Sequence, residues 1–326
     1  MISVALATYN GSSYIEQQIE SILHQTKSVD EIVICDDCST DDTISILQSY
    51  QQKYPNLFKI MQNEKQLGCA KNFEKAISNA NGDIIFIADQ DDVWNEDKVE
   101  KMMDLLSSSN AKGCFSDSSI VDAKLLSLGT SHLQIRGFSK GSFDSSKIKL
   151  RKYLLPLFLK RVPPAAHDMA ITADAKSIIL PFPNLPNCHD TWIGLCLVAL
   201  DGWAFTNEEL TLFRQHNNNA SNSGKQGGII AKIKQAKASI KNNTFAWNAQ
   251  LYKELITRLE DKCDKDVLEL LHDRMEHSLA RSNMQCNIIK RLPLIVKEIL
   301  NRRYFRYGRG WLNIVQDMFF RNACYK

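Results

Sequence analysis

The stretch Ile84–Trp94, IIFIADQDDVW, decides how the rest of the chain is interpreted. It begins with four apolar residues after Gly82, which is typical of a short strand buried on both faces of a parallel sheet. Three carboxylates, Asp89, Asp91 and Asp92, follow within four positions. Like charges this close repel each other, so they indicate either a site where a divalent cation or hydroxyl donors compensate them, or a solvated acidic turn. Ligands of open α/β sheets bind beyond the carboxyl ends of the strands, which favours a site.

Predicted strands and helices alternate around this stretch. Short apolar runs predict strands at 3–8, 31–35, 58–61, 84–87 and 169–173. Apolar residues at helical spacing predict helices at 14–23, 44–50, 73–80, 99–106 and 192–200. Two of these helices carry start signals, a capping box of Ser13 and Glu16 and an N-cap at Asn95. The alternation implies an α/β fold with parallel strand pairing and right-handed crossovers.

The pattern weakens after Gly113. Glycines and serines interrupt the apolar residues at 113–161, so we expect an insertion with short irregular elements there. Two short strands are predicted at 204–206 and 210–213, and the polar run Asn217–Gly224 predicts a flexible lid. Helical patterns that start at 229–236 and continue at 251–259 and 268–275 then predict an α-helical C-terminal region.

Composition excludes several classes of protein. The longest apolar stretch, Ile193–Leu200, is far shorter than the ~20 residues of a membrane-spanning helix, and no basic leader of a signal peptide precedes the first strand. Nine cysteines without zinc-ligand spacing favour a reducing cytoplasm. Neither GxGxxG after the first strand nor GxxxxGK[ST] occurs, which argues against the usual dinucleotide-binding and P-loop folds.

The charges are distributed unevenly. Half of the 40 Lys and Arg residues lie at 225–326, together with only ten of the 37 Asp and Glu residues. The acidic N-terminal part, 1–224, suits a site built from carboxylates. The basic C-terminal part, 225–326, suits contact with an anionic partner such as a lipid surface.

Four ordered segments resemble the successive signatures of family 2 inverting glycosyltransferases of the GT-A fold. They are ATYN at 7–10, SILHQT at 21–26, EIVICDDCS at 31–39 and DQDD at 89–92. Within that family, ADQDDVW at 88–94 with Leu67-Gly68 and Asn72-Phe73 is most similar to bacterial rhamnosyltransferases of surface-polysaccharide synthesis. The resemblance implies a GT-A domain at 1–224, with a nucleotide-sugar-binding half at 1–112 and an acceptor half at 113–224, and says nothing specific of the helical region at 225–326.

The resemblance also implies a donor site. In the family an Asp-x-Asp motif reaches the ribose and holds Mg²⁺ or Mn²⁺ on the diphosphate, a role that falls to Asp89 and Asp91. Several relatives place a His or a mobile basic loop near the position of His216 to complete the metal or diphosphate shell, so His216 is expected as a direct ligand or as support for that shell, with a structural His as the alternative. Asp37 matches the carboxylate that accepts from the pyrimidine N3–H. Lys71 is expected either near the diphosphate or as a solvated helix residue. The expected donor contacts are Thr8, Tyr9, Asn10, Asp37, Lys71, Asp89 and Gln90.

The family's base is an acidic residue at the start of a helix, roughly a hundred residues after the Asp-x-Asp motif, and Asp190 matches it. The alternative for Asp190 is a helix N-cap. His189, Trp192 and Asp92 are expected at the acceptor, although Trp192 could instead pack inside its helix. His167-Asp168 departs from the family's Gly-Cys-Thr-like stretch, and we expect this pair to line the acceptor pocket or to cap a turn.

The last segment, 291–326, interleaves arginines with aromatic residues. This mixture predicts an interfacial helix that contacts an anionic membrane surface, with a packing helix and a nucleic-acid surface as alternatives. We expect the membrane contact and no nucleic-acid partner.

The sequence therefore predicts a metal-dependent inverting glycosyltransferase at the cytoplasmic face of the cell membrane. The favoured donor is dTDP-rhamnose, with UDP-hexoses as the alternative. The expected acceptor is a saccharide hydroxyl, lipid-linked, in O-antigen, capsule or other cell-surface polysaccharide synthesis. A nucleotidyltransferase would normally show a basic, glycine-rich N-terminal signature, which is absent. A non-catalytic subunit of a polysaccharide assembly complex would not need the full carboxylate set of Asp37, Asp89, Asp91 and Asp190.

Overall fold

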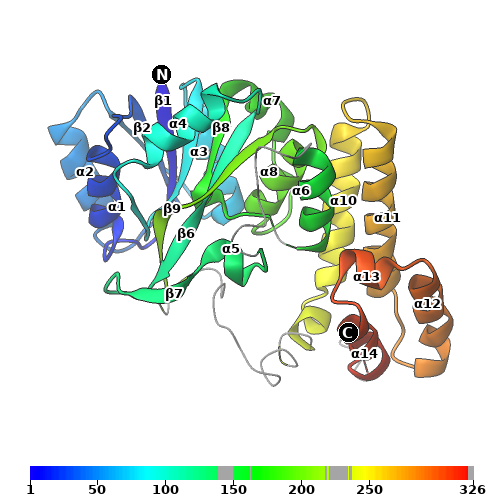
Figure 1. Cartoon of the computed structure of the whole chain (residues 1–326). Helices are drawn as coiled ribbons and strands as arrows, with labels where there is room; N and C mark the ends of the chain where they lie inside the picture. Colours follow the sequence, from blue (N-terminus) through cyan, green and yellow to red (C-terminus); the bar gives the residue numbers. More distant parts are fainter. Residues whose placement is uncertain (139–149, 162, 217–218, 220–233, 235–236, 322–326) are drawn as a thin grey trace. The chain divides into compact units, whose positions relative to one another are not determined.

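The computed structural model describes residues 1–138, 150–161, 163–216, 219, 234 and 237–321. The chain divides into two compact units (Figure 1). The N-terminal unit comprises Met1–Arg151 and Pro163–Gly224, and the C-terminal unit comprises Lys152–Val162 and Lys225–Lys326. The predicted lid at 217–224, apart from Asn219, and most of the helical pattern at 229–236 lie outside the described residues.

Within the described residues, the N-terminal unit holds one nine-stranded sheet of order β3-β2-β1-β4-β8-β6-β9-β5, with β7 paired to β6. The strands are β1 Ile2–Thr8, β2 Glu31–Asp36, β3 Phe58–Gln62, β4 Ile84–Asp89, β5 Val93–Trp94, β6 Gly113–Val121, β7 Ser127–Ser131, β8 Met169–Thr172 and β9 Trp203–Arg214. The first four strands in this order pair in parallel, as predicted. Strand β8 runs antiparallel to both of its neighbours, β4 and β6.

Helices cover both faces of this sheet (Figure 1). They are α1 Ile15–Leu23, α2 Thr43–Lys53, α3 Cys69–Asn79, α4 Lys98–Ser107, α5 His132–Ile135, α7 Lys176–Ile179 and α8 His189–Ala199, with 3-10 turns η1 Ala166–Asp168 and η2 Ala173–Ala175. The main core joins α1, α2 and α4 to alternate residues of the sheet, such as Val4 and Leu6 of β1. Helix α3 packs on β1 and β2, and we assign it to the opposite face because Phe73 and Ile77 are buried outside that core. The predicted α/β fold is confirmed.

Four local predictions were wrong. Helix α1 begins after Tyr14 and helix α4 after Asp97, both without a side-chain cap, so neither the Ser13 capping box nor the Asn95 N-cap forms. The side chain of Asn95 instead donates to the carbonyl of Glu209 (2.7 Å). The segment expected to be irregular contains the long strand β6 inside the sheet. The two strands predicted at 204–213 are one strand, β9, which passes the polar interruption with shifts of register against β6.

The parallel register sets where the polar ends of the strands meet. Thr8 of β1 lies opposite Asp36 of β2, and Ala7 lies opposite Asp89 of β4. The turn after β1, the carboxylates after β2 and the acidic end of β4 therefore gather at one edge of the sheet.

The described residues of the C-terminal unit are largely helical, as predicted. Its helices are α6 Leu150–Lys160, which starts at the boundary, and α10 Thr244–Leu259, α11 Lys265–Ser282, α12 Ile288–Leu300, α13 Arg303–Tyr307 and α14 Trp311–Phe319. A small core of Met284, Ile295, Tyr304 and Ile314 joins α12, α13 and α14. No helix within the described residues combines the length and the apolar character needed to cross a bilayer.

Candidate active site

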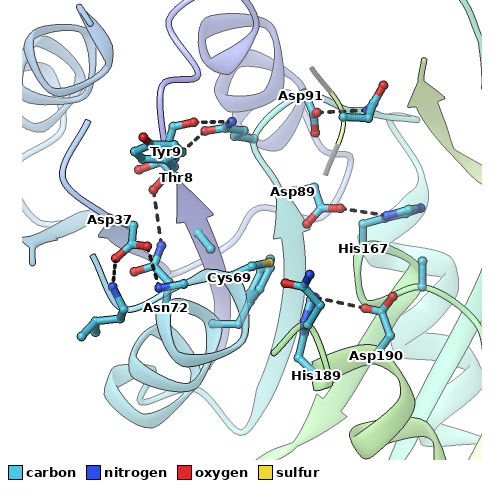
Figure 2. Close-up of a pocket in the computed structure, with 18 of the residues that line it drawn as sticks. Thr8, Tyr9, Asp37, Cys69, Asn72, Asp89, Asp91, His167, His189 and Asp190 are labelled. Atoms are coloured by element: carbon cyan, nitrogen blue, oxygen red, sulfur yellow. Dashed lines mark hydrogen bonds and ion pairs between the residues drawn. The ribbon is translucent and has the colours of Figure 1, made fainter. Parts of the chain in front are cut away.

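A cavity of about 670 Å³ opens at the edge where β1, β2 and β4 end. Eight of the predicted site residues line it, namely Thr8, Tyr9, Asp37, Asp89, Gln90, Asp91, His189 and Asp190. Figure 2 shows Asp37 and Thr8 on one side of the view and Asp89, His167 and Asp190 on the other. The cavity thus joins segments from the beginning, the middle and the end of the N-terminal unit.

Asp37 is held by the start of helix α3. Its Oδ1 accepts from Leu67 N (2.7 Å) and Asn63 Nδ2 (2.9 Å), and its Oδ2 accepts from Gly68 N (2.9 Å). Gly68 has φ 82°, a left-handed conformation that favours glycine and aims its N–H at the carboxylate. A carboxylate offers about four lone-pair directions, so roughly one on Oδ2 is left for a ligand donor.

Tyr9 is fixed at the next position along the edge. Gln90 accepts from Tyr9 N at Oε1 (2.9 Å) and donates to Tyr9 O from Nε2 (3.0 Å). The amide of Gln90 is therefore occupied by the backbone of the turn after β1. The tyrosine ring remains 47% exposed, which leaves a face open to a flat ligand.

Asp91 points toward the segment after β9. Its Oδ2 lies 2.8 Å from His216 Nε2 and 3.4 Å from Asn219 Nδ2. Burial raises the pKa of Asp91, the charge of Asp89 raises it further, and the hydrogen bond with His216 opposes them. The predicted proximity of His216 to the acidic motif is present, although His216 itself is not part of the cavity wall.

His167 joins the acidic motif to a second buried carboxylate. Its Nδ1 lies 3.1 Å from Asp89 Oδ2 and 3.5 Å from Asp92 Oδ2, and its Nε2 lies 3.3 Å from Asp168 Oδ2. The pKa of His167 is lowered by burial, but Asp168 and Asp92 together hold it well above its usual value. Burial alone would raise the pKa of Asp168, yet His167 and His132 hold it far below the usual range. His167 is therefore a buried cation between carboxylates.

The network continues toward the other end of the cavity. His132 Nδ1 lies 3.8 Å from Asp168 Oδ2, and its Nε2 accepts from Arg136 Nε (3.1 Å). Burial and the charge of Arg136 lower the pKa of His132 to about 4, so this imidazole is neutral at physiological pH. The rings of His132 and His167 stack on each other (5.4 Å) and on Phe213 (4.8 and 5.0 Å).

Asp190 lies in the first turn of helix α8, whose N-cap is Cys188. Its Oδ1 accepts from Ala166 N (3.0 Å) and lies 3.1 Å from His189 Nε2, while its Oδ2 is 3.8 Å from Arg136 Nη2. Burial would raise the pKa of Asp190, but His189, Arg136 and the Ala166 N–H together hold it below its usual value. The side chain keeps 26% exposure, so this ionised carboxylate reaches the cavity.

Two predicted donor contacts need correction. Asn10 does not line the cavity, because its Oδ1 accepts from Thr40 N (2.8 Å) and ties the turn after β1 to the loop after β2. Lys71 does not line it either. The Lys71 ammonium donates to Glu74 (2.7 Å) and to the carbonyl of Phe182 (2.8 Å), which holds it beside its own helix.

Two predicted acceptor contacts are also wrong. Trp192 is 1% exposed and donates from Nε1 to the carbonyl of Ile179 (2.7 Å), so it is a core residue of α8. Asp92 is fully buried, and its Oδ1 accepts from the N–H of Arg214 (3.1 Å). Packing therefore removes both side chains from any acceptor.

Sequence reasoning did not assign His132, Arg136 or Phe213 to the site, although all three line the cavity. The first two lie in the segment interpreted as an irregular insertion, and no motif marked them. His167 did carry a signal, since it departs from the family pattern, but its link to Asp89 depends on a contact between distant segments.

The cavity edge suits the divalent cation that the family resemblance implies. Asp89 and Asp91 offer hard oxygen ligands, and His216 Nε2 lies beside Asp91. Ligand atoms of Asp89, Asp92 and His167 also lie within 4.8 Å of one another, but His167 as a cation pairs with these carboxylates and is not itself a metal ligand. Buried Asp92 Oδ2 accepts no hydrogen bond within the described residues. This local excess of carboxylate over donors fits Mg²⁺ or Mn²⁺.

Comparison with known proteins points to one family. Residues 3–143 match the family model described as glycosyl transferase family 2. The dTDP-rhamnosyl transferase RfbG of Shigella flexneri is 31% identical over 228 residues, which cover 66% of this chain and 72% of that protein. The chondroitin synthase of Escherichia coli is 39% identical over 104 residues, 32% of this chain and 15% of that protein.

Solved structures share the fold. Staphylococcus aureus TarS 1–349 in complex with UDP has a TM-score of 0.58 at 18% identity and covers 97% of this chain and 79% of that one. The mannosyltransferase PcManGT of Pyrobaculum calidifontis, in complex with GDP-Man and Mn²⁺, has a TM-score of 0.51 at 17% identity, over 98% and 85% of the two chains.

A parallel sheet whose carboxyl edge presents an Asp-x-Asp motif, with a separate carboxylate across the same cavity, defines a glycosyltransferase of the GT-A fold. The chain belongs to glycosyltransferase family 2.

Proposed function

We propose that this enzyme transfers rhamnose from dTDP-rhamnose, or alternatively a hexose from UDP-hexose, to a hydroxyl of a saccharide acceptor with inversion at the anomeric carbon. The observation that carries the proposal is that Asp37, the Asp89–Asp91 motif and Asp190 share one cavity. The similarity to a dTDP-rhamnosyl transferase supports rhamnose as the sugar.

The nucleotide binds at the Asp37 end. Thymine and uracil both present an N3–H donor, which meets the Asp37 acceptor direction left unused by Leu67, Gly68 and Asn63. The exposed ring of Tyr9 stacks on the base. This arrangement favours pyrimidine nucleotides without choosing between dTDP and UDP.

The diphosphate lies over the acidic motif. Asp89, Asp91 and His216 would hold Mg²⁺ or Mn²⁺, which would supply positive charge beside the diphosphate as it leaves. His167 Nδ1 pairs with the Asp89 carboxylate (3.1 Å), while its Nε2 lies 3.3 Å from the charge of Asp168. His167 therefore positions a ligand rather than contacting the sugar.

The acceptor enters beside Asp190. The hydroxyl of the acceptor gives its proton to the Asp190 carboxylate while the oxygen attacks the anomeric carbon from the face opposite the diphosphate. Arg136, His189 and the Ala166 N–H keep Asp190 ionised and oriented before this step. One displacement with one base inverts the configuration, so a β-linked donor gives an α-linked product.

The proposal extends to the class of acceptor. We place the enzyme in O-antigen, capsule or related cell-surface polysaccharide synthesis, acting on a lipid-linked saccharide.

The test is a reaction assay with purified enzyme and a panel of nucleotide sugars. We expect release of the nucleoside diphosphate from dTDP-rhamnose, dependent on Mn²⁺ or Mg²⁺ and abolished by EDTA. Calorimetric titration of dTDP with and without Mn²⁺ separates metal-assisted binding from turnover. Undiminished turnover in EDTA would refute metal dependence, and turnover of purine nucleotide sugars alone would refute the role of Asp37. The anomeric coupling in the product NMR spectrum tests inversion.

A further inference from the structure

Helix α12 presents a continuous apolar stripe to solvent. Ile289 and Leu300 are 77% and 76% exposed, and Leu292 and Val296 lie between them at 44% and 45%. At about 100° per residue these four side chains fall within an arc of roughly 80°. The buried side chains of the helix, Arg291, Ile295 and Glu298, centre about 140° from the middle of the stripe, so the stripe faces away from the packing of this unit.

Helix α14 repeats the arrangement. Trp311 and Leu312 are 68% and 61% exposed, with Val315 and Phe319 continuing the same side at 43% and 54%. Its inner side contributes Ile314 to the same small core. Two neighbouring helices thus each leave a row of large apolar side chains in water, which is unfavourable unless another surface covers them.

The charged residues of 288–321 are themselves sorted by sign, although the exposed Glu276 of α11 pairs with Arg303, and Asp273 of α11 pairs with Arg306 (2.8 Å). Every exposed charged side chain at 288–321 is positive, and these are Lys290, Lys297, Arg302, Arg306 and Arg309. The two acidic residues of the segment are buried. Glu298 meets His277 and Arg303 (3.1 Å), and Asp317 meets Arg281 (2.7 Å).

We propose that the outer sides of α12 and α14 form a docking surface for an anionic lipid bilayer. Apolar side chains of an interfacial helix enter the boundary between headgroups and acyl chains, and lysine and arginine beside them meet anionic headgroups. At about 100° per residue, Lys290 and Lys297 lie on one flank of the α12 stripe. The burial of Glu298 and Asp317 leaves no exposed acidic side chain within 288–321 itself.

Not every basic or aromatic residue of 288–321 belongs to the proposed docking surface. Arg291, Arg303 and Arg321, together with Tyr304 and Tyr307, are buried inside the unit and form no part of the surface. The docking surface goes beyond glycosyl transfer and does not depend on it, although it would bring the enzyme to a lipid-linked acceptor.

The test uses the full chain and vesicle co-sedimentation without substrate. Vesicles are made of phosphatidylcholine alone, or of equimolar phosphatidylcholine and phosphatidylglycerol. Two variants address the surface, Ile289→Gln with Leu300→Gln, and Lys290→Gln with Lys297→Gln. Glutamine is chosen because it is a good helix former, and all four side chains are exposed.

We expect the wild type to bind the anionic vesicles more tightly than the neutral ones. The lysine variant should lose about 25-fold on anionic vesicles, since each cation near the surface strengthens binding about fivefold. The apolar variant should lose about a hundredfold on anionic vesicles. Matched controls change exposed residues elsewhere, Leu126→Gln with Leu128→Gln and Lys253→Gln with Lys265→Gln, and should bind as the wild type does.

Other occupants give different results. If the wild type ignores both kinds of vesicle, or if the α12 variants bind as well as the controls, the proposal is overturned. A second copy of the chain as the occupant would appear as an oligomer in sedimentation velocity that Ile289→Gln with Leu300→Gln dissociates, without vesicle binding. An unchanged melting temperature in each variant shows that the chain is still folded without relying on the proposed donor, so a negative result here is distinct from failure of the proposed reaction.

Discussion

Replacing Asp190 by Asn isolates the proposed proton transfer from the local structure. Asparagine keeps the size of the side chain. Its carbonyl oxygen can still accept from Ala166 N, which lies 3.0 Å from the Asp190 carboxylate in the wild type. The change removes the negative charge beside Arg136 Nη2 (3.8 Å) and His189 Nε2 (3.1 Å). The amide cannot accept a proton from a hydroxyl at useful strength.

The two effects differ in size. Loss of the charge pairing should cost about 1 kcal/mol of unfolding free energy, because the carboxylate is partly exposed and the hydrogen bond to Ala166 survives. That corresponds to about 2–4 °C in melting temperature for a domain of this size. Loss of a general base should lower kcat about 10²- to 10⁴-fold, or roughly 3–5 kcal/mol of activation free energy. The loss of rate therefore greatly exceeds the loss of stability.

Three measurements on one purified variant separate these effects. We expect the dTDP dissociation constant in the presence of Mn²⁺ to be nearly unchanged, because Asp190 lies across the cavity from Asp37 (Figure 2). Steady-state kinetics should show the fall in kcat, and a thermal melt should show a shift of a few degrees at most. Turnover close to the wild-type value would refute the assignment and return Asp190 to a structural role at the start of α8.

Three further substitutions test the rest of the N-terminal unit. Asp37→Ala should weaken dTDP and UDP alike by about tenfold in calorimetry, since both lose the acceptor for N3–H, and unequal losses would contradict this. His167→Gln should weaken Mn²⁺-dependent dTDP binding by releasing Asp89, whereas metal-free binding should stay at the wild-type level. Burial raises the pKa of Asp117 to about 6, so its stabilising contribution is present below its ordinary pKa of 3.8 and is lost as the pH rises through about 6. Asp117→Asn should therefore match the wild type in urea unfolding at about pH 4 and exceed it at about pH 7 by up to about 3 kcal/mol; an equal difference at both values would show that this carboxyl does not titrate as described.

The fold was predictable where its signals are local. The apolar runs of β1, β2 and β4 and the helical stripes between them specify parallel pairing without knowledge of distant contacts. Strand β6 was missed because Ser116, Asp117 and Ser118 interrupt its apolar pattern. These polar side chains are buried in the middle of the sheet, and two of them have partners in other segments: Asp117 Oδ1 accepts from Leu133 N (2.9 Å), and Ser118 donates to Asp168 (3.1 Å). A periodicity argument cannot anticipate a polar strand whose partners are supplied by the tertiary structure.

The predicted helix starts were wrong for a related reason. Ser13 and Asn95 are residue types that commonly cap helices, but helices α1 and α4 both begin after the predicted cap positions. The side-chain amide of Asn95 instead donates to strand β9. An N-cap stabilises a helix by about 1 kcal/mol, so tertiary contacts of similar free energy can move the start of the helix.

Most candidate residues at the donor end could be predicted from the sequence, because their carboxylates come directly at the ends of predicted strands. The network behind it was not. Contacts between side chains run from Asp89 to His167 (3.1 Å), on to Asp168 (3.3 Å), His132 (3.8 Å) and Arg136 (3.1 Å), and end at Asp190 (3.8 Å). These six residues come from β4, η1, α5 and its C-cap, and α8, so no sequence interval relates them.

This chain of contacts alternates in charge from one end of the cavity to the other. His167 is a cation between two carboxylates, and Arg136 is a cation beside a third, with the neutral ring of His132 between them. In a buried setting each charge is stabilised only by its neighbours, so moving one member displaces the next. The carboxylate proposed to hold the metal and the carboxylate proposed to take the proton are therefore oriented by one connected set of side chains.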